Sequence, residues 1–451
     1  MNFKDEFYQK LKLLVLPIAI QNFMLALVSA TDAIMLGWID QTSLSAVSLA
    51  GQVQFVLSLF ISGIAAGAGI MAAQYWGKRD AASIEKVIPI ALRTNLLFSG
   101  LFTILAGFYP EMLMRIFTND AALVASGSQY LRAVALSYVL CGISQVYLIL
   151  LKNTGHAAVS SRISSTAVVL NIILNAILIY GLCGAPALGI RGAAYATVAA
   201  RVVELIWAYL ETKKPERVRI LWNRLFSSAG KILSEDFWRY TLPVLAASLV
   251  WGIAYVLYSV IMGHMGSDAV AANSITSIAK SLLSCLIRGV SGGAGVLIGN
   301  LLGANELEKA REYGGRLSHL SIAIGIVTGG LLMLISPAIV HFAPLSDTAA
   351  EYLQYMLLFC GLNLMAQSVN TTVLDGIFCA GGDAKFDMQG NIGAMWCFSV
   401  PLGFLAAFWL KLPVMVVYCI VNLDEIVKLP AVYHHYKKYI WVRNITRDVE
   451  D

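Results

Sequence analysis

Apolar stretches long enough to cross a lipid bilayer recur twelve times along the 451 residues of this chain. A helix that spans the hydrocarbon core needs about 20 residues. Charged residues make up only 13% of the chain, roughly half of the ~25% that is typical of soluble domains, so a water-facing surface cannot be covered. We therefore predict an all-α membrane protein with twelve transmembrane helices, whose surroundings are the lipid bilayer. The approximate limits of the predicted spans are 13–36, 49–75, 87–108, 125–151, 158–181, 188–210, 238–262, 274–301, 315–335, 351–378, 387–409 and 413–436.

Basic residues are distributed unevenly between the two sides of these spans. The N-terminus, every second connection and the C-terminal tail together hold 23 lysines and arginines, whereas the alternate connections hold only Arg115, Arg191 and Lys411. Because positively charged loops stay in the cytoplasm, we predict a multi-pass protein with both termini cytoplasmic. The same residues explain the net charge of +5 without a nucleic-acid partner.

The two halves of the sequence repeat one another at a constant spacing, close to half the chain length. LPIAIQNFMLALVSATDAIMLG, which begins at Leu16, resembles LPVLAASLVWGIAYVLYSVIMG, which begins at Leu242. At this spacing, which we call the repeat spacing, Pro17 corresponds to Pro243 and Gly155 to Gly381. Six spans in each half give both halves the same direction in the membrane, and a cavity is expected between such parallel repeats. We predict an N-terminal six-helix lobe at 1–210, a cytoplasmic linker at 211–237 and a C-terminal six-helix lobe at 238–451.

Several classes of protein lack support in the sequence. The chain contains no phosphate-binding GxxxxGK[ST] motif, no HExxH and no GxSxG, so neither ATP-driven transport nor hydrolytic chemistry is indicated. The seven cysteines form no CxxC pair, which argues against a zinc or redox site. We predict a protein that is not an enzyme and needs no cofactor.

The chain resembles the multidrug and toxic compound extrusion (MATE) family of the MOP superfamily over nearly its whole length. The resemblance is carried by the first-span motif at Leu16, the glycine-rich GIAAGAGIMAAQYWG, the NIILNAILIYG and LGIRGAAYATVAARVVE segments, and GIFCAGGD. It implies a bacterial inner-membrane transporter with two six-helix lobes, and the protein is expected to act as a monomer. The implied activity is export of organic, often cationic and amphipathic compounds, driven by inward flow of Na⁺ or H⁺.

One carboxylate and three neutral polar side chains are predicted to converge in the first half. Asp32 lies alone in the first span, about four residues from its outer end, and a charge within a span is a functional candidate by default. Asn171 and Asn175 are four residues apart and share one face of the fifth span, while Thr197 lies at a similar depth in the sixth. This set suits a proton on Asp32 or a partly dehydrated Na⁺; alternatively, the asparagines only join helices by hydrogen bonds.

The resemblance assigns the cation-coupling role to these four residues. Many MATE relatives carry an aspartate where this chain has Asn175, so one negative charge is missing and the coupling ion stays open. The repeat places Tyr258, Cys397 and Pro401 at the positions of Asp32, Asn171 and Asn175. The predicted coupling site therefore belongs to the first half alone.

The second half carries a different set of charges within its spans. Glu425 and Lys428 are three residues apart on one face, as are Arg201 and Glu204 in the first half. These charges either neutralise one another or form a second site for a proton or a cationic substrate. The second-half candidates are Lys280, Arg288, Asp424, Glu425 and Lys428.

Aromatic and methionine side chains in the first and seventh spans are candidates for an adaptable substrate cavity, although most such side chains in membrane helices simply pack. The candidates are Phe23, Met24, Met35, Trp251, Tyr255 and Tyr258.

The favoured function is thus a cation-coupled antiporter for small organic molecules. One alternative within the same superfamily is a flippase for a lipid-linked or lipid-like substrate. An alternative of another class is a channel or receptor that does not alternate its access, which the duplicated halves disfavour.

Overall fold

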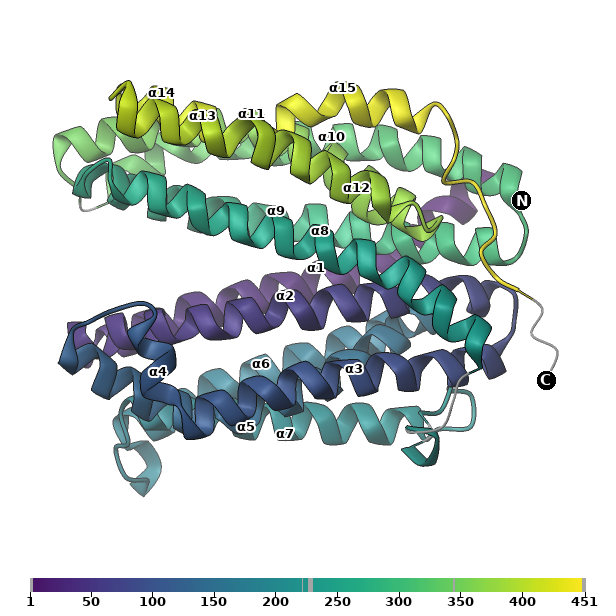
Figure 1. The fold of residues 1–451 in the computed structure, drawn as a ribbon, viewed down its shortest axis with the longest axis horizontal. Helices are drawn as coiled ribbons and strands as arrows, with labels where there is room; N and C mark the ends of the chain where they lie inside the picture. The colour runs from purple at the N-terminus through teal and green to yellow at the C-terminus, as the bar shows by residue number, and fades with distance from the viewer. Residues whose placement is uncertain (1–2, 221, 226–229, 344, 448–451) are drawn as a thin grey trace. The chain divides into compact units, whose positions relative to one another are not determined.

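The computed structural model describes residues 3–220, 222–225, 230–343 and 345–447, and these residues are helical almost throughout, without a strand (Figure 1). Residues 221 and 226–229 of the predicted linker lie outside the described residues, as do residue 344 and the chain ends 1–2 and 448–451 of the two predicted lobes. The first half contains α1 (Phe3–Gly37), α2 (Gln41–Gly77), α3 (Ala81–Phe108), α4 (Pro110–Arg115), α5 (Ala121–Leu151), η1 (Lys152–His156), α6 (Ala157–Tyr180), η2 (Leu182–Gly184) and α7 (Ile190–Thr212). After η3 (Trp222–Arg224), the second half contains α8 (Lys231–Gly263), α9 (Ser267–Gly303), α10 (Leu307–Phe342), α11 (Asp347–Thr371), η4 (Thr372–Phe378), α12 (Ala384–Asn391), η5 (Ile392–Ser399), α13 (Val400–Phe404), η6 (Leu405–Trp409), α14 (Val414–Val421) and α15 (Asp424–Tyr436).

The helices agree with the predicted spans except at 413–436. Ten stretches of the described residues are long and apolar enough to cross a membrane, and one of them, Ala121–Tyr180, contains both α5 and α6. These two helices meet at a kink where Gly155 has a φ of +82°, which glycine adopts without steric cost. The remaining predicted span, 413–436, consists of α14 and α15, which are 8 and 13 residues long. Neither of these two helices crosses a membrane by itself.

Aspartates begin three of the first-half helices and so set the short connections before them. Asp40 Oδ1 accepts a hydrogen bond from the Ser43 amide at 2.6 Å, and Asp80 Oδ1 accepts one from the Ser83 amide at 2.9 Å. Asp120 caps α5 in the same way. Such N-caps satisfy backbone donors that have no partner in the first helical turn.

Large apolar side chains stand on the outer surface of the helices. Leu13, Leu97, Phe108 and Leu334 are each more than two thirds exposed. Exposed apolar area on this scale is unfavourable in water and is accommodated by lipid. The chain is therefore a multi-pass membrane protein.

The chain forms two compact units that exchange the beginnings of two helices. The first lobe is Ile20–Leu245, and the second lobe combines Ala246–Arg447 with the described residues up to Ala19. The first part of α1 thus belongs to the second lobe, while the first part of α8 belongs to the first lobe. The two points of exchange are separated by the repeat spacing of the sequence.

Glycines make the exchanged helices fit, in two equivalent places. A Cβ atom added at Gly67 of α2 would lie 2.6 Å from Thr241 Cα of α8, and one added at Gly63 would lie 2.9 Å from Leu245 Cα. In the second lobe, a Cβ added at Gly289 of α9 would lie 2.9 Å from Ala19 Cα of α1. Gly63 and Gly289 correspond to one another at the repeat spacing, as do Ala19 and Leu245. Small residues at such crossings allow the backbones of membrane helices to approach closely.

The segment after α15 packs onto the end of the second lobe. Trp441 is fully buried and belongs to a core with Phe7, Tyr313 and Phe378. Arg443 donates hydrogen bonds to the carbonyl oxygens of Gly381 and Gly382 at 2.7 and 2.5 Å, where the chain turns from η4 into α12. The described tail is thus part of the folded lobe.

Candidate functional site

The four first-half candidates form one chain of hydrogen bonds, which we name the first-lobe cluster (Asp32, Asn171, Asn175 and Thr197). Asn175 Nδ2 donates to Asp32 Oδ1 at 2.6 Å and lies 3.3 Å from Asn171 Oδ1. Asn171 Nδ2 in turn donates to Thr197 Oγ1 at 3.3 Å. The cluster joins α1, α6 and α7 within the first lobe, so the predicted convergence of these four side chains is present in the structure.

Local structure holds the cluster in place. Asn171 and Asn175 are one helical turn apart on α6, are 5% and 0% exposed, and therefore project from the same buried face. Thr197 donates its own hydroxyl hydrogen to the Ala193 carbonyl at 3.0 Å, which leaves its oxygen free to accept from Asn171. The Tyr180 hydroxyl donates to the Met35 carbonyl at 2.7 Å and ties the end of α6 to the end of α1.

An acceptor in this cluster lacks a partner. Among the described residues, Asn175 Oδ1 is buried and receives no hydrogen bond. A buried polar atom without a partner costs about 1–3 kcal/mol, so Asn175 Oδ1 is an acceptor available to one more hydrogen-bond donor. Asp32 is the carboxylate of the cluster, and the nearby phenol of Tyr130 was not among the predicted residues.

The second lobe contains a larger polar network, built where the last span is broken. α14 ends at Val421 and α15 begins at Asp424, so the helix is interrupted in the middle of the span. Two asparagines of α11 satisfy carbonyls at this break: Asn363 Nδ2 donates to the Asn422 carbonyl at 2.7 Å, and Asn370 Nδ2 donates to the Glu425 carbonyl at 2.7 Å. Interrupted membrane helices commonly carry binding sites, because their free backbone groups face polar partners.

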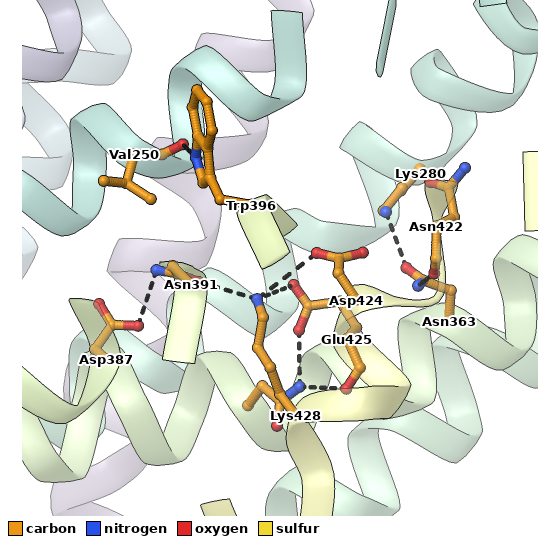
Figure 2. Close-up of polar contacts among 11 residues, drawn as sticks. Val250, Lys280, Asn363, Asp387, Asn391, Trp396, Asn422, Asp424, Glu425 and Lys428 are labelled. Carbon is orange, nitrogen blue, oxygen red and sulfur yellow. Dashed lines mark hydrogen bonds and ion pairs between the residues drawn. The ribbon is translucent and has the colours of Figure 1, made fainter. Parts of the chain in front are cut away.

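Lys428 lies at the centre of this network (Figure 2). Its ammonium donates to Asn391 Oδ1 at 2.9 Å and lies 3.5 Å from Glu425 Oε1 and 3.6 Å from Asp424 Oδ2. Asn391 Nδ2 donates to Asp387 Oδ1 at 3.1 Å. We name Asp387, Asn391, Asp424, Glu425 and Lys428, together with Asn370, the second-lobe network.

The other two second-half candidates lie beside this network. Lys280 of α9 donates to Asn363 Oδ1 at 2.9 Å and is within electrostatic reach of Asp424. Arg288 is exposed and makes no hydrogen bond or ion pair among the described residues. Arg288 is within electrostatic reach of Asp375 in η4, whose other charged neighbours are Asp387, Glu425 and Lys428.

The cavity candidates differ in exposure. Phe23 and Tyr255 are 46% and 43% exposed, and Tyr255 stacks on Trp251 with ring centroids 5.5 Å apart. Tyr258 is buried in a second-lobe core. Met24 is partly exposed, and Met35 packs against the first-lobe core. The substrate-lining role of these six residues stays a prediction.

The two duplicated segments of the chain each match the model of a known protein family. The MatE family model matches residues 17–177 and 243–405. The chain belongs to the MatE family. The two matched segments begin at Pro17 and Pro243, the corresponding prolines of the two repeats, and this confirms the resemblance drawn from the motifs.

Individual relatives of this MATE protein are distant but cover nearly all of it. The uncharacterized transporter YisQ of Bacillus subtilis is 21% identical, over 95% of this chain and 93% of YisQ. The probable multidrug resistance protein YoeA of the same organism is 21% identical, over 99% and 97% of the two chains. A solved MOP superfamily transporter from Pyrococcus furiosus has a TM-score of 0.86 at 20% identity, over 96% of this chain and 95% of that one. The predicted fold class, twelve helices in two lobes, is confirmed.

Sequence reasoning missed Asn370, Asp387 and Asn391 of the second-lobe network in this MATE chain, and the neighbouring Asn363. Asn363 and Asn370 are seven residues apart, and Asp387 and Asn391 are four apart, so each pair lies on one helix face. That spacing was a usable signal for an interhelical polar site. The interruption of the last span did have a signal in Asp424, Glu425 and Lys428, but 413–436 was interpreted as one helix because its first part, Val414–Val421, is apolar throughout.

Proposed function

We propose that this MATE protein is a secondary active antiporter of the bacterial inner membrane. It exports organic, often cationic and amphipathic compounds in exchange for H⁺ or Na⁺, as a monomer with both termini cytoplasmic. The name of YoeA, a probable multidrug resistance protein, supports the substrate class. Neither an enzymatic reaction nor a nucleic-acid partner is part of the proposal.

The observation that carries the proposal is the contact between Asp32 and Asn175. An ionised Asp32 accepts the amide hydrogen of Asn175, as in the structure, and leaves Asn175 Oδ1 without a donor. When Asp32 is protonated, rotation of the amide lets Asn175 Oδ1 accept the new hydrogen. When Na⁺ binds, the same rotation turns the oxygen toward the ion. Both forms remove the negative charge from the buried site, which is the condition for it to face alternate sides of the membrane.

The two coupling ions have different requirements in the first-lobe cluster. H⁺ needs only Asp32 and one acceptor. Na⁺ also needs oxygens from Asn171, Asn175 and Thr197, and the cluster supplies one carboxylate only. The proposal therefore keeps both ions, and the two gradients in the test below distinguish them.

The test is transport in proteoliposomes. The purified protein is reconstituted with a fluorescent organic cation, and a proton gradient and an Na⁺ gradient are imposed separately. We expect uptake or release of the dye under at least one gradient. If neither gradient moves the dye while a fluorescent lipid analogue crosses between leaflets, the antiporter assignment is wrong and the flippase is the better description.

A further inference from the structure

We propose that the second-lobe network is a binding site for a primary ammonium group, occupied in this structure by the chain's own Lys428. The inference concerns the second lobe and is independent of ion coupling at Asp32. Its extension to a transported amine rests on the proposed function.

The geometry around Lys428 is that of a cage for one tetrahedral cation. Oxygens from Asn391, Glu425 and Asp424 lie 2.9, 3.5 and 3.6 Å from its Nζ, and an ammonium has three hydrogens to donate. Asn391 comes from α12, whereas the two carboxylates come from the start of α15. Lys428 and Asp424 are 5% and 6% exposed, so water replaces these oxygens poorly.

The contacts are looser than those of a settled ion pair. Charged N–H···O bonds are usually about 2.7–2.9 Å long, yet only the neutral amide of Asn391 lies at such a distance. The carboxylate oxygens of Glu425 and Asp424 are both more than 3.2 Å from Lys428 Nζ, at 3.5 and 3.6 Å. Lys428 therefore makes its one short contact to the neutral amide, and the two carboxylates receive no hydrogen bond of that length from the ammonium.

A second observation points to a ligand. Asn370 is 2% exposed, its Nδ2 donates to Glu425 Oε2 at 2.8 Å, and its Oδ1 receives no hydrogen bond among the described residues. A buried acceptor beside the cage is thus ready for one more donor. The Asp387 carboxyl group adds a further acidic side chain next to the cage, because it accepts a hydrogen bond from Asn391 Nδ2 at 3.1 Å, so the surroundings favour a cation over a neutral molecule.

The site belongs to the second lobe only. At the repeat spacing, the positions of Asp424, Glu425 and Lys428 are taken in the first half by Val198, Ala199 and Val202. The cage is therefore an addition to the duplicated scaffold. Lys428 keeps the cage neutralised when no ligand is present, because removing one partner of a buried ion pair leaves an expensive uncompensated charge.

The experiment replaces the side chain of Lys428 with a free ammonium ion of the same shape. In Lys428→Ala the missing atoms are those of propylammonium, which is added to the purified protein in detergent. We expect the Tm of Lys428→Ala to rise with the logarithm of the propylammonium concentration, by about 3 °C at 100 times the Kd. Affinity for wild type, in which Lys428 competes, should be at least about tenfold weaker.

Three controls make the result specific. Lys428→Met fills the space of the lysine stem without a charge and should gain nothing from propylammonium. Lys411→Ala removes an exposed lysine and should also show no response. Tetramethylammonium has the charge but no N–H donor, and should not stabilise Lys428→Ala.

The inference is overturned if propylammonium shifts wild type and Lys428→Ala equally, or if tetramethylammonium is as effective. If Lys428→Ala does not fold alone, it is expressed and purified with propylammonium present; failure to recover folded protein overturns the inference as well. The double variant Asp32→Asn, Lys428→Ala separates the two proposals, because propylammonium should stabilise it even if ion-coupled transport is absent.

Discussion

Asn175 donates an amide hydrogen to Asp32 over 2.6 Å, although the two residues are 143 positions apart in the chain. The contact joins α6 to α1 close to the end of α1 at Gly37. The first-lobe cluster contains no lysine or arginine, so Asp32 has a neutral amide and no cation as its hydrogen-bond partner within it. In the second lobe, by contrast, the carboxylates of Asp424 and Glu425 form ion pairs with Lys428.

Asp32→Asn should abolish ion-coupled transport without unfolding the protein. The two side chains have nearly the same shape, and loss of the charge removes the group that exchanges the ion. We expect dye transport to fall by at least about tenfold, roughly 1.4 kcal/mol, in proteoliposomes under either gradient. Asp40→Asn is the matched control, because asparagine remains a good N-cap for α2; equal loss in both variants would contradict the assignment.

Asn175→Asp should create a site that depends on Na⁺. Two carboxylates in contact repel one another, and a bound cation relieves the repulsion. We expect Na⁺ at 100 times its Kd to stabilise this variant by about 2.7 kcal/mol, measured as a rise in Tm that K⁺ does not reproduce. Asn95→Asp places a carboxylate at another buried first-lobe position and should lose stability at every Na⁺ concentration.

Gly67→Ala should separate α2 from the first part of α8. The new methyl group would lie 2.6 Å from Thr241 Cα, and a backbone atom cannot move aside as a flexible side chain can. We expect a loss of about 1–3 kcal/mol, seen as a lower Tm in detergent. Gly51→Ala on the same helix meets no atom within 4 Å and should be neutral or slightly stabilising. Similar effects of the two substitutions would refute the close crossing.

Trp441→Ala should destabilise the second lobe, although the residue lies beyond the last helix. Trp441 is fully buried, whereas Trp38 is 76% exposed. Removal of a buried tryptophan typically costs about 3–5 kcal/mol, and thermal unfolding monitored by light scattering will measure the difference. Trp38→Ala should leave the Tm nearly unchanged; a tail that contributes nothing would give the same Tm for both variants.

The span count and the repeat were predictable because both depend on long apolar segments and on glycine and proline spacing. Asp32 was predictable because a single charge stands out within an apolar span. Its partners followed from helix periodicity: Asn171 and Asn175 occupy one face, and Thr197 lies at the same depth. The division at 210 and 238 stays a prediction, since hydropathy reports where the chain crosses the membrane but not which helices pack together.

The second-lobe network was only partly predictable. Glu425 and Lys428 were recognised as an opposite-charge pair, yet the central partner of Lys428 is Asn391 on another helix. Neutral asparagines are not conspicuous in a sequence, and contacts between distant helices depend on packing that one chain alone does not reveal. The packing of α1 up to Ala19 with the second lobe was likewise not predictable, because it depends on the close approach of Ala19 to Gly289, which only the folded structure reveals.

The exchange of helix beginnings has a consequence for biosynthesis. The part of α1 up to Ala19 acquires its packing partner only when Gly289 has been synthesised, long after α1 itself. The start of the first span is therefore surrounded by lipid, without its protein contact, until α9 has been inserted. A chain that stops before α9 would leave this part of α1 without its packing partner. A chain that stops before Lys231 would also lack the start of α8, so the first lobe would be incomplete as well. Quality-control proteases of the membrane would then act on both lobes.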